Sequence, residues 1–151
     1  MVELAISDPV AMASGGDYVL DEQVGYLLRQ AMQRHLAIFG ENMTGDLTST
    51  QFSVLFRLHE LGPCSQNLLG RRAAMDAATV KGVIDRLTLR GLTEARSDAE
   101  DGRLTVVSLT EQGRNLIETA IPLAGRITAE TLKPLSPREQ AAFLKLLRKL
   151  C

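Results

Sequence analysis

The sequence predicts a mainly α-helical protein that carries one small β-hairpin and has six helices. Apolar residues recur every three or four positions in most segments after residue 18, and helix-capping residues precede many of these segments. Two short strand-like runs flank one polar loop at residues 98–103. With 151 residues, 45% hydrophobic and only 4% aromatic, the chain suits one compact unit with an aliphatic core.

The chain is expected to divide into a disordered tail, residues 1–17, and one folded unit, residues 18–151. The tail lacks sustained periodicity and contains Ser7-Asp8-Pro9 and Ser14-Gly15-Gly16. The folded unit begins with a long helix that ends within residues 40–45. Its apolar positions form one stripe: Val24, Leu27, Leu28, Ala31, His35 and Ile38.

A second and a third helix follow. Thr48 and Gln51 have the form of a capping box, and Gly62-Pro63 ends the helix that they open. One face of this helix is expected to carry Phe52, Leu55, Phe56 and His59. Ser65 can then cap a short third helix that runs to about Ala73.

The fourth helix is expected to run from an Asp76 cap to Arg90, with Gly91 in the left-handed conformation that commonly ends helices. Its buried stripe is predicted to be Val80, Val83, Ile84 and Leu87. The opposite face would present Ala78, Lys81, Gly82, Asp85 and Arg86.

The hairpin and two further helices complete the chain. Residues 92–97 and 104–109 are strand-like. Thr110 caps a fifth helix of roughly two dozen residues, which Pro122 can bend, and a capping box with Pro137 in the first turn opens the sixth. The sixth helix has an apolar face that it could not hide alone: Leu135, Phe143, Leu144, Leu147 and Leu150.

The charge distribution points to DNA rather than to a uniformly basic protein. The net charge is −1, and residues 1–24 carry five acids and no Lys or Arg. Residues 65–96, by contrast, carry six basic and three acidic residues. Two short helices followed by a hairpin describe a winged helix-turn-helix, so this positive excess lies where phosphate contacts would need it.

The order of elements, together with several short motifs, resembles the MarR family of bacterial transcriptional regulators over nearly the whole chain after the tail. The motifs are Asp85-Arg86-Leu87, Arg90-Gly91-Leu92, Arg96, Asp101-Gly102-Arg103 and Leu109-Thr110-Glu111-Gln112-Gly113-Arg114. The resemblance implies a homodimeric repressor whose dimerisation helices are residues 18–45 and 110–151 and whose DNA-binding lobe is residues 46–109. It also implies a pseudo-palindromic operator in double-stranded DNA, with half-sites roughly 10 bp apart.

The resemblance nominates DNA-binding residues on the reading helix, the third helix and the wing. On the reading helix and the strand after it they are Ala77, Ala78, Thr79, Lys81, Gly82, Arg86 and Arg96. Ser65 and Gln66 would meet the phosphate backbone, while Asp101 would orient Arg103 toward the minor groove. Gly82 departs from the family, which often has Arg there, and Lys81 can take over that contact. The alternative that the wing is an ordinary solvated hairpin tip, which does not contact DNA, also remains.

The same resemblance implies a small aromatic acid effector, held between the dimer helices and the DNA-binding lobe. The candidate ligand residues are Tyr26, His35, Phe39, Gln51, Phe52, His59 and, as a charge partner, Arg96. A cationic side chain could pair with a carboxylate there, although His35 and His59 could equally be satisfied core residues. Residues 18–30 are also similar to repressors of nicotinic acid breakdown, whose effector is 6-hydroxynicotinate.

Other classes of function find less support in the sequence. It has no glycine-rich phosphate loop, nucleophile elbow or catalytic cluster, so an enzyme is not expected. Two His and two Cys without ligand spacing predict no metal and no cofactor, and the absence of a spanning apolar run predicts a cytoplasmic protein away from membranes. Two alternatives remain: a redox-sensing repressor that uses Cys64, and a winged-helix module that binds protein.

Overall fold

The computed structural model describes residues 18–151, so the predicted tail lies outside the described residues. The chain divides into two compact units, with the boundary in the sequence between Arg34 and His35. The first contains the 3₁₀ helix η2 (Leu20–Glu22) and the first part of α1 (Val24–Asn42). In this unit the guanidinium of Arg29 lies 5.3 Å from the centre of the Tyr26 ring.

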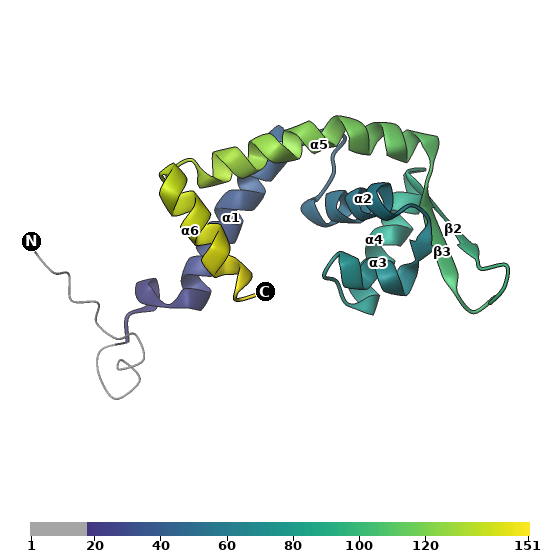
Figure 1. The fold of residues 1–151 in the computed structure, drawn as a ribbon, viewed down its shortest axis with the longest axis horizontal. Helices are drawn as coiled ribbons and strands as arrows, with labels where there is room; N and C mark the ends of the chain where they lie inside the picture. The colour runs from purple at the N-terminus through teal and green to yellow at the C-terminus, as the bar shows by residue number, and fades with distance from the viewer. Residues whose placement is uncertain (1–17) are drawn as a thin grey trace, which may run out of the picture. The chain divides into compact units, whose positions relative to one another are not determined.

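The second unit holds the remaining elements, and Figure 1 shows α2, α3 and α4 gathered beside a small sheet. The elements are α2 (Ser49–Leu61), β1 (Cys64–Ser65), α3 (Gln66–Arg72), α4 (Ala77–Leu89), β2 (Thr93–Ser97), β3 (Thr105–Leu109), α5 (Glu111–Leu132) and α6 (Pro137–Arg148). The mainly helical class with a small β wing is therefore confirmed. Within residues 18–151, every helix is too short or too polar to traverse a lipid bilayer.

The sheet has three antiparallel strands in the order β1-β3-β2, one more than the sequence predicts. Cys64 and Ser65 pair with Val107 and Val106 and so form the extra strand. A strand of two residues, the second of which is also the cap of α3, carries no period-2 pattern, which explains why the sequence does not reveal it.

Local capping decides where the helices begin. The capping boxes at Thr48 and Ser136 are both formed, and Asp76 and Thr110 accept the predicted N–H bonds. Gly91 has a φ of +73°, as a left-handed residue at a helix end requires. The fifth helix continues through Pro122 without interruption.

One core joins α2, α4, the sheet and α5. It contains all four residues of the stripe predicted on α4, none more than 2% exposed. Its buried members are Leu47, Val54, Leu55, Leu58, Leu69, Val80, Val83, Ile84, Leu87, Leu92, Val107, Ile117 and Ala120. This core holds α4 so that its other face is exposed.

One predicted stripe needs correction. On α2, Leu55 is buried and Phe52 and Phe56 pack against the core as predicted. His59 is exposed, however, because the face of α2 that packs on α4 and α5 is centred on Val54, Leu55 and Leu58. On α1, which is expected to be a dimerisation helix, Phe39 is the only residue that is buried in a single chain. The apolar residues of α6 are also uncovered in a single chain: Phe143 is 41% exposed and Leu150 is 71% exposed.

Candidate functional site

The reading helix α4 begins at a firm cap. The Asp76 carboxylate accepts the N–H of Thr79 at 2.7 Å, and this bond lowers the pKa of Asp76 below its usual value. The cap fixes the first turn of α4, whose residues Ala77, Ala78 and Thr79 are all exposed. The structure therefore presents the predicted reading surface to solvent.

The basic residues of α4 are held loosely. Lys81 Nζ lies 2.7 Å from Asp85 Oδ2, but both side chains are more than half exposed, so a phosphate could replace the carboxylate at little cost. A Cβ at Gly82 would lie no closer than 3.8 Å to its nearest neighbour, Arg86 Nη2. A side chain would therefore fit at position 82, and steric crowding does not explain why this position of α4 is a glycine.

The start of α3 and the wing line a common hollow. Ser65 caps α3 by accepting the N–H of Leu68 at 3.2 Å. The hollow has a volume of about 150 Å³ and is lined by Ser65, Gln66, Asn67, Arg103, Leu104 and Thr105. The structure thus brings three predicted DNA-binding residues, distant in sequence, to one place.

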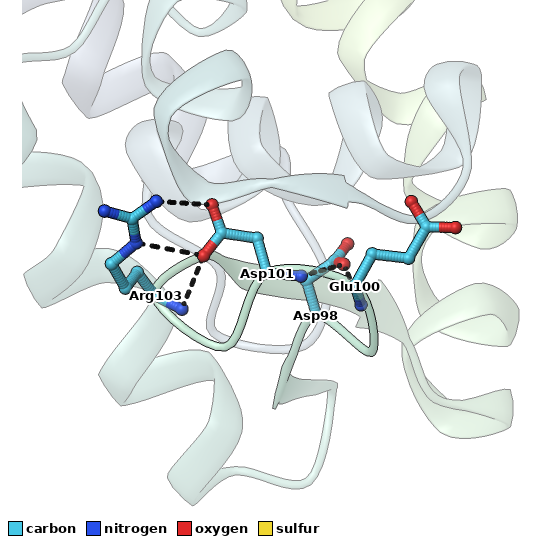
Figure 2. A network of polar contacts seen from close by, with 4 residues as sticks. All are labelled: Asp98, Glu100, Asp101 and Arg103. Atoms are coloured by element: carbon cyan, nitrogen blue, oxygen red, sulfur yellow. Dashed lines mark hydrogen bonds and ion pairs between the residues drawn. The ribbon is translucent and has the colours of Figure 1, made fainter.

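The wing tip is an ordered polar turn (Figure 2). Asp98 Oδ1 accepts the N–H groups of Glu100 and Asp101 at 2.8 and 3.0 Å. Asp101 in turn accepts bonds from the backbone N–H of Arg103 and from its Nε, both at 3.1 Å. Because Asp101 is anchored, the Arg103 side chain, 91% exposed, is aimed from a fixed base.

Arg103 also affects the protonation of its partner, Asp101. Its guanidinium and its backbone N–H hold the pKa of Asp101 below the usual range. A lowered pKa means that the pair is fully charged above the ordinary Asp pKa and is lost only as the pH falls below it. The wing pair is therefore intact at neutral pH.

The structure places the predicted ligand residues in different environments. Four rings, those of His35, Phe39, Phe52 and Phe56, form a continuous row with centroid separations of 6.5, 6.3 and 6.1 Å. His35 Nδ1 also lies 2.8 Å from Thr131 Oγ1 on α5. Two predicted ligand residues, His35 and Phe39, thus meet a third, Phe52.

The other predicted ligand residues are engaged elsewhere or exposed. Gln51 is buried, and its Oε1 accepts the N–H of Thr48 and a bond from Arg90. Tyr26 lies in the first unit, and His59 is exposed on α2. Arg96 forms its ion pair with Glu94 on β2, at 2.9 Å, and not with a predicted ligand residue.

Known proteins match this arrangement. The model of the MarR family matches residues 47–105. The transcriptional repressor NicR of Pseudomonas putida is 42% identical over 134 residues, which cover 88% of this chain and 85% of NicR. This chain belongs to the MarR family.

Two solved structures extend the comparison to ligands. BpsR of Bordetella bronchiseptica, described in terms of regulation of its DNA binding by 6-hydroxynicotinic acid, is 45% identical, with a TM-score of 0.84 and coverage of 89% of this chain and 97% of BpsR. A mutant of Escherichia coli MarR bound to operator DNA is 25% identical, with a TM-score of 0.79 and coverage of 89% and 99%. The present MarR-family chain is thus a transcriptional repressor and not an enzyme.

One connection in this MarR-family fold joins segments far apart in the chain and has no signal in the sequence. The guanidinium of Arg90, at the end of α4, donates to the carbonyl oxygen of Gly45 and to Gln51 Oε1, the latter at 3.3 Å. Gly45 and Asp46 both have positive φ, so the loop before α2 is sharply turned where Arg90 holds it. The reading helix is therefore tied to the loop that follows α1.

Cys64 is a poor candidate for an oxidant sensor. Its side chain is half-buried on β1, and burial raises the pKa of its thiol. A raised pKa leaves less of the reactive thiolate at neutral pH. Among residues 18–151, moreover, no group of three or more His, Cys, Asp or Glu could hold a metal ion.

We expect Cys64 to react slowly. At neutral pH, iodoacetamide should label the exposed Cys151 well before Cys64, and labelling of Cys64 should accelerate only above the usual cysteine pKa, as followed by peptide mass spectrometry. Peroxide should leave DNA binding unchanged in both the native protein and Cys64→Ser. A loss of binding that Cys64→Ser prevents would instead support the redox alternative.

Proposed function

We propose that this repressor binds a pseudo-palindromic operator as a homodimer and releases it when a small aromatic carboxylic acid, similar to 6-hydroxynicotinate, binds. The observation that carries the DNA half of the proposal is the anchored Arg103 beside the start of α3, on the same lobe as the exposed face of α4. An exposed guanidinium at a wing tip suits the narrow minor groove, where negative potential is concentrated.

The proposal of a homodimer is supported by apolar side chains that are exposed in a single chain. Half or more of the surface of Leu20, Val24 and Met32 is exposed in one part of the chain, and that of Leu146 and Leu150 in another. Monomeric proteins rarely leave such residues uncovered in groups. A second copy of the chain would bury them and would match the two-fold symmetry of a palindromic operator.

The proposal of an aromatic acid effector is supported by the similar proteins NicR and BpsR and by the row of aromatic rings that begins at His35. NicR and BpsR resemble this chain over most of its length, and the DNA binding of BpsR is described as regulated by 6-hydroxynicotinic acid. The row of rings that runs from His35 through Phe39 and Phe52 to Phe56 offers the apolar surface that a planar aromatic acid needs. Regulation of genes for nicotinate degradation would follow, and a cytoplasmic location stays a prediction.

The mechanism is a shift between two states of the dimer. An acid that binds more tightly to the DNA-free arrangement of the two lobes favours that arrangement, and by linkage the operator weakens acid binding to the same degree. The acid need not touch DNA. It needs only a different affinity for the two arrangements.

One titration tests the proposed function. Fluorescence anisotropy with labelled DNA from upstream of the protein's own gene should show sequence-preferring binding that weakens steeply as salt rises. Addition of 6-hydroxynicotinate should release the DNA, whereas its uncharged amide should not. Binding that ignores sequence would contradict the operator, and release by neither compound nor by related pyridine and benzene carboxylates would contradict the effector.

A further inference from the structure

A hollow between α2 and the end of α3 combines aromatic rings with guanidinium groups. It has a volume of about 210 Å³ and is lined by Phe52, Ser53, Phe56, Arg57, Arg72, Ala73 and Ala74. We propose that this hollow binds the aromatic carboxylate and that Arg72 is its main charge partner. The inference rests on the proposed function, because it assigns a site to the effector.

The aromatic wall suits a flat ring. Phe52 and Phe56 are stacked with an angle of 22° between their planes, and both side chains are only half-buried. Aromatic rings gain from offset stacking beyond the area that they bury. An apolar cavity of about 150 Å³ holds benzene, so this hollow has room for one six-membered ring and a carboxylate.

The cationic rim suits the carboxylate. Arg57 is held in place, because its Nε donates to the Arg72 carbonyl oxygen at 2.8 Å and its Nη1 pairs with Glu60 at 2.7 Å. These bonds use two of its five donors. Within residues 18–151, the Arg72 guanidinium makes no hydrogen bond or ion pair, so it can donate two parallel hydrogen bonds to the oxygens of one carboxylate.

A second hollow, between α1 and α5, is less suited to an anion. It has a volume of about 350 Å³, and its charged lining residues are Arg126, Glu41 and Glu130. Glu130 is paired with Lys133 at 3.6 Å, so the remaining charges of the second hollow, Arg126 and Glu41, cancel. In the α2–α3 hollow Arg57 is paired with Glu60, and the positive charge of Arg72 remains to attract an anion. Charge therefore favours the hollow at Arg72.

The hollow includes residues of the turn that precedes the reading helix α4, so a ligand bound there could affect DNA binding. Ala73 and Ala74 belong to the turn between α3 and α4, and Asp76 caps the reading helix two residues later. Ala74 has a φ of +55°, a strained conformation for alanine. A ligand whose contacts depend on this turn would change the balance between two positions of α4.

Calorimetric titration of the full-length protein with 6-hydroxynicotinate and with its uncharged amide tests the site. Arg72→Ala should weaken binding of the acid about tenfold or more, while the affinity for the amide changes less than about twofold. Phe56→Leu should weaken both, because it removes the stacking surface. The matched control Arg126→Ala should change neither. Circular dichroism checks that each variant is folded, which the exposure of Arg72 favours.

The outcomes separate the site from the function. If Arg72→Ala leaves the affinity for the acid unchanged while His35→Ala abolishes it, the inference is overturned and the effector lies elsewhere. Should Arg72 prove necessary for binding while the bound acid fails to release DNA, the site stands and the effector half of the proposed function fails. No binding of the acid to the native protein overturns both.

Discussion

Gly113→Ala is expected to lower the free energy of unfolding by about 3 kcal/mol or more, or to prevent folding altogether. A Cβ at Gly113 would lie 1.9 Å from the carbonyl oxygen of Leu92 and 2.9 Å from its carbonyl carbon. Both atoms belong to the backbone, so no side-chain rotation can relieve the overlap. The first turn of α5 would have to move away from the end of α4.

That movement would break further bonds. Thr110 Oγ1 donates to the carbonyl oxygen of Gly91 at 2.6 Å and accepts the N–H of Gly113 at 3.0 Å, and the N–H of Thr110 donates to Leu92. Since Leu92 is itself in the core, the damage would spread into the DNA-binding lobe. Denaturant unfolding followed by circular dichroism measures the loss, with all variants at one protein concentration because a dimer's stability depends on it.

Gly125→Ala is the matched control in the same helix. A Cβ at Gly125 meets nothing within 4 Å, so alanine should raise the free energy of unfolding by about 0.5–1 kcal/mol through its higher helix propensity. Equal stabilities for the two variants would show that α5 does not approach Leu92 as closely as the structure indicates.

Arg103→Ala is expected to weaken operator binding about 10- to 100-fold and to reduce the slope of log affinity against log salt by about one. The side chain is 91% exposed and its contacts are with Asp101, so the stability of the fold should change by less than about 0.5 kcal/mol. The operator affinity of Arg103→Lys should lie between that of the native protein and that of Arg103→Ala, because lysine keeps the charge but loses the planar pairing with Asp101. Anisotropy titrations at several salt concentrations give both quantities.

Two further variants separate the effect of the orientation of the Arg103 side chain from the effect of its charge. Asp101→Asn removes the ion pair that orients Arg103 but leaves the guanidinium, so it should weaken binding less than Arg103→Ala. Arg138→Ala removes an exposed arginine of α6 and should leave binding unchanged. If Arg103→Ala behaves like Arg138→Ala, the wing is a solvated hairpin tip and does not contact DNA.

The features that sequence analysis predicted correctly depend on near neighbours in the chain. The boxes at Thr48 and Ser136, the cap at Asp76 and the left-handed Gly91 each join residues within four positions. Their residue types restrict the backbone directly, so the sequence is sufficient to recognise them. The pairing of Asp101 with Arg103 is equally local, which is why the wing could be predicted before its geometry was known.

The features that it missed join distant residues. Arg57 and Arg72 are ordinary surface positions of two helices until α2 and α3 pack together, and Arg90 meets Gly45 only across the fold. His59 was assigned to a packed stripe because apolar spacing alone does not say which of two adjacent faces meets α4 and α5. Such contacts depend on how helices pack.

By itself, the sequence determined that the protein has six helices and a wing, where five of the six helices begin, and that the positive charge lies on the reading segment. The first helix is the exception, because it is predicted to begin at residue 18, whereas α1 begins at Val24 after the 3₁₀ helix η2. Bonds between near neighbours suffice for those features. Only the tertiary structure decided that Cys64 and Ser65 form a third strand, that Gly113 must lack a side chain, and that two arginines line the same hollow as Phe52 and Phe56. These depend on close approach between segments far apart in the chain, which core packing sets.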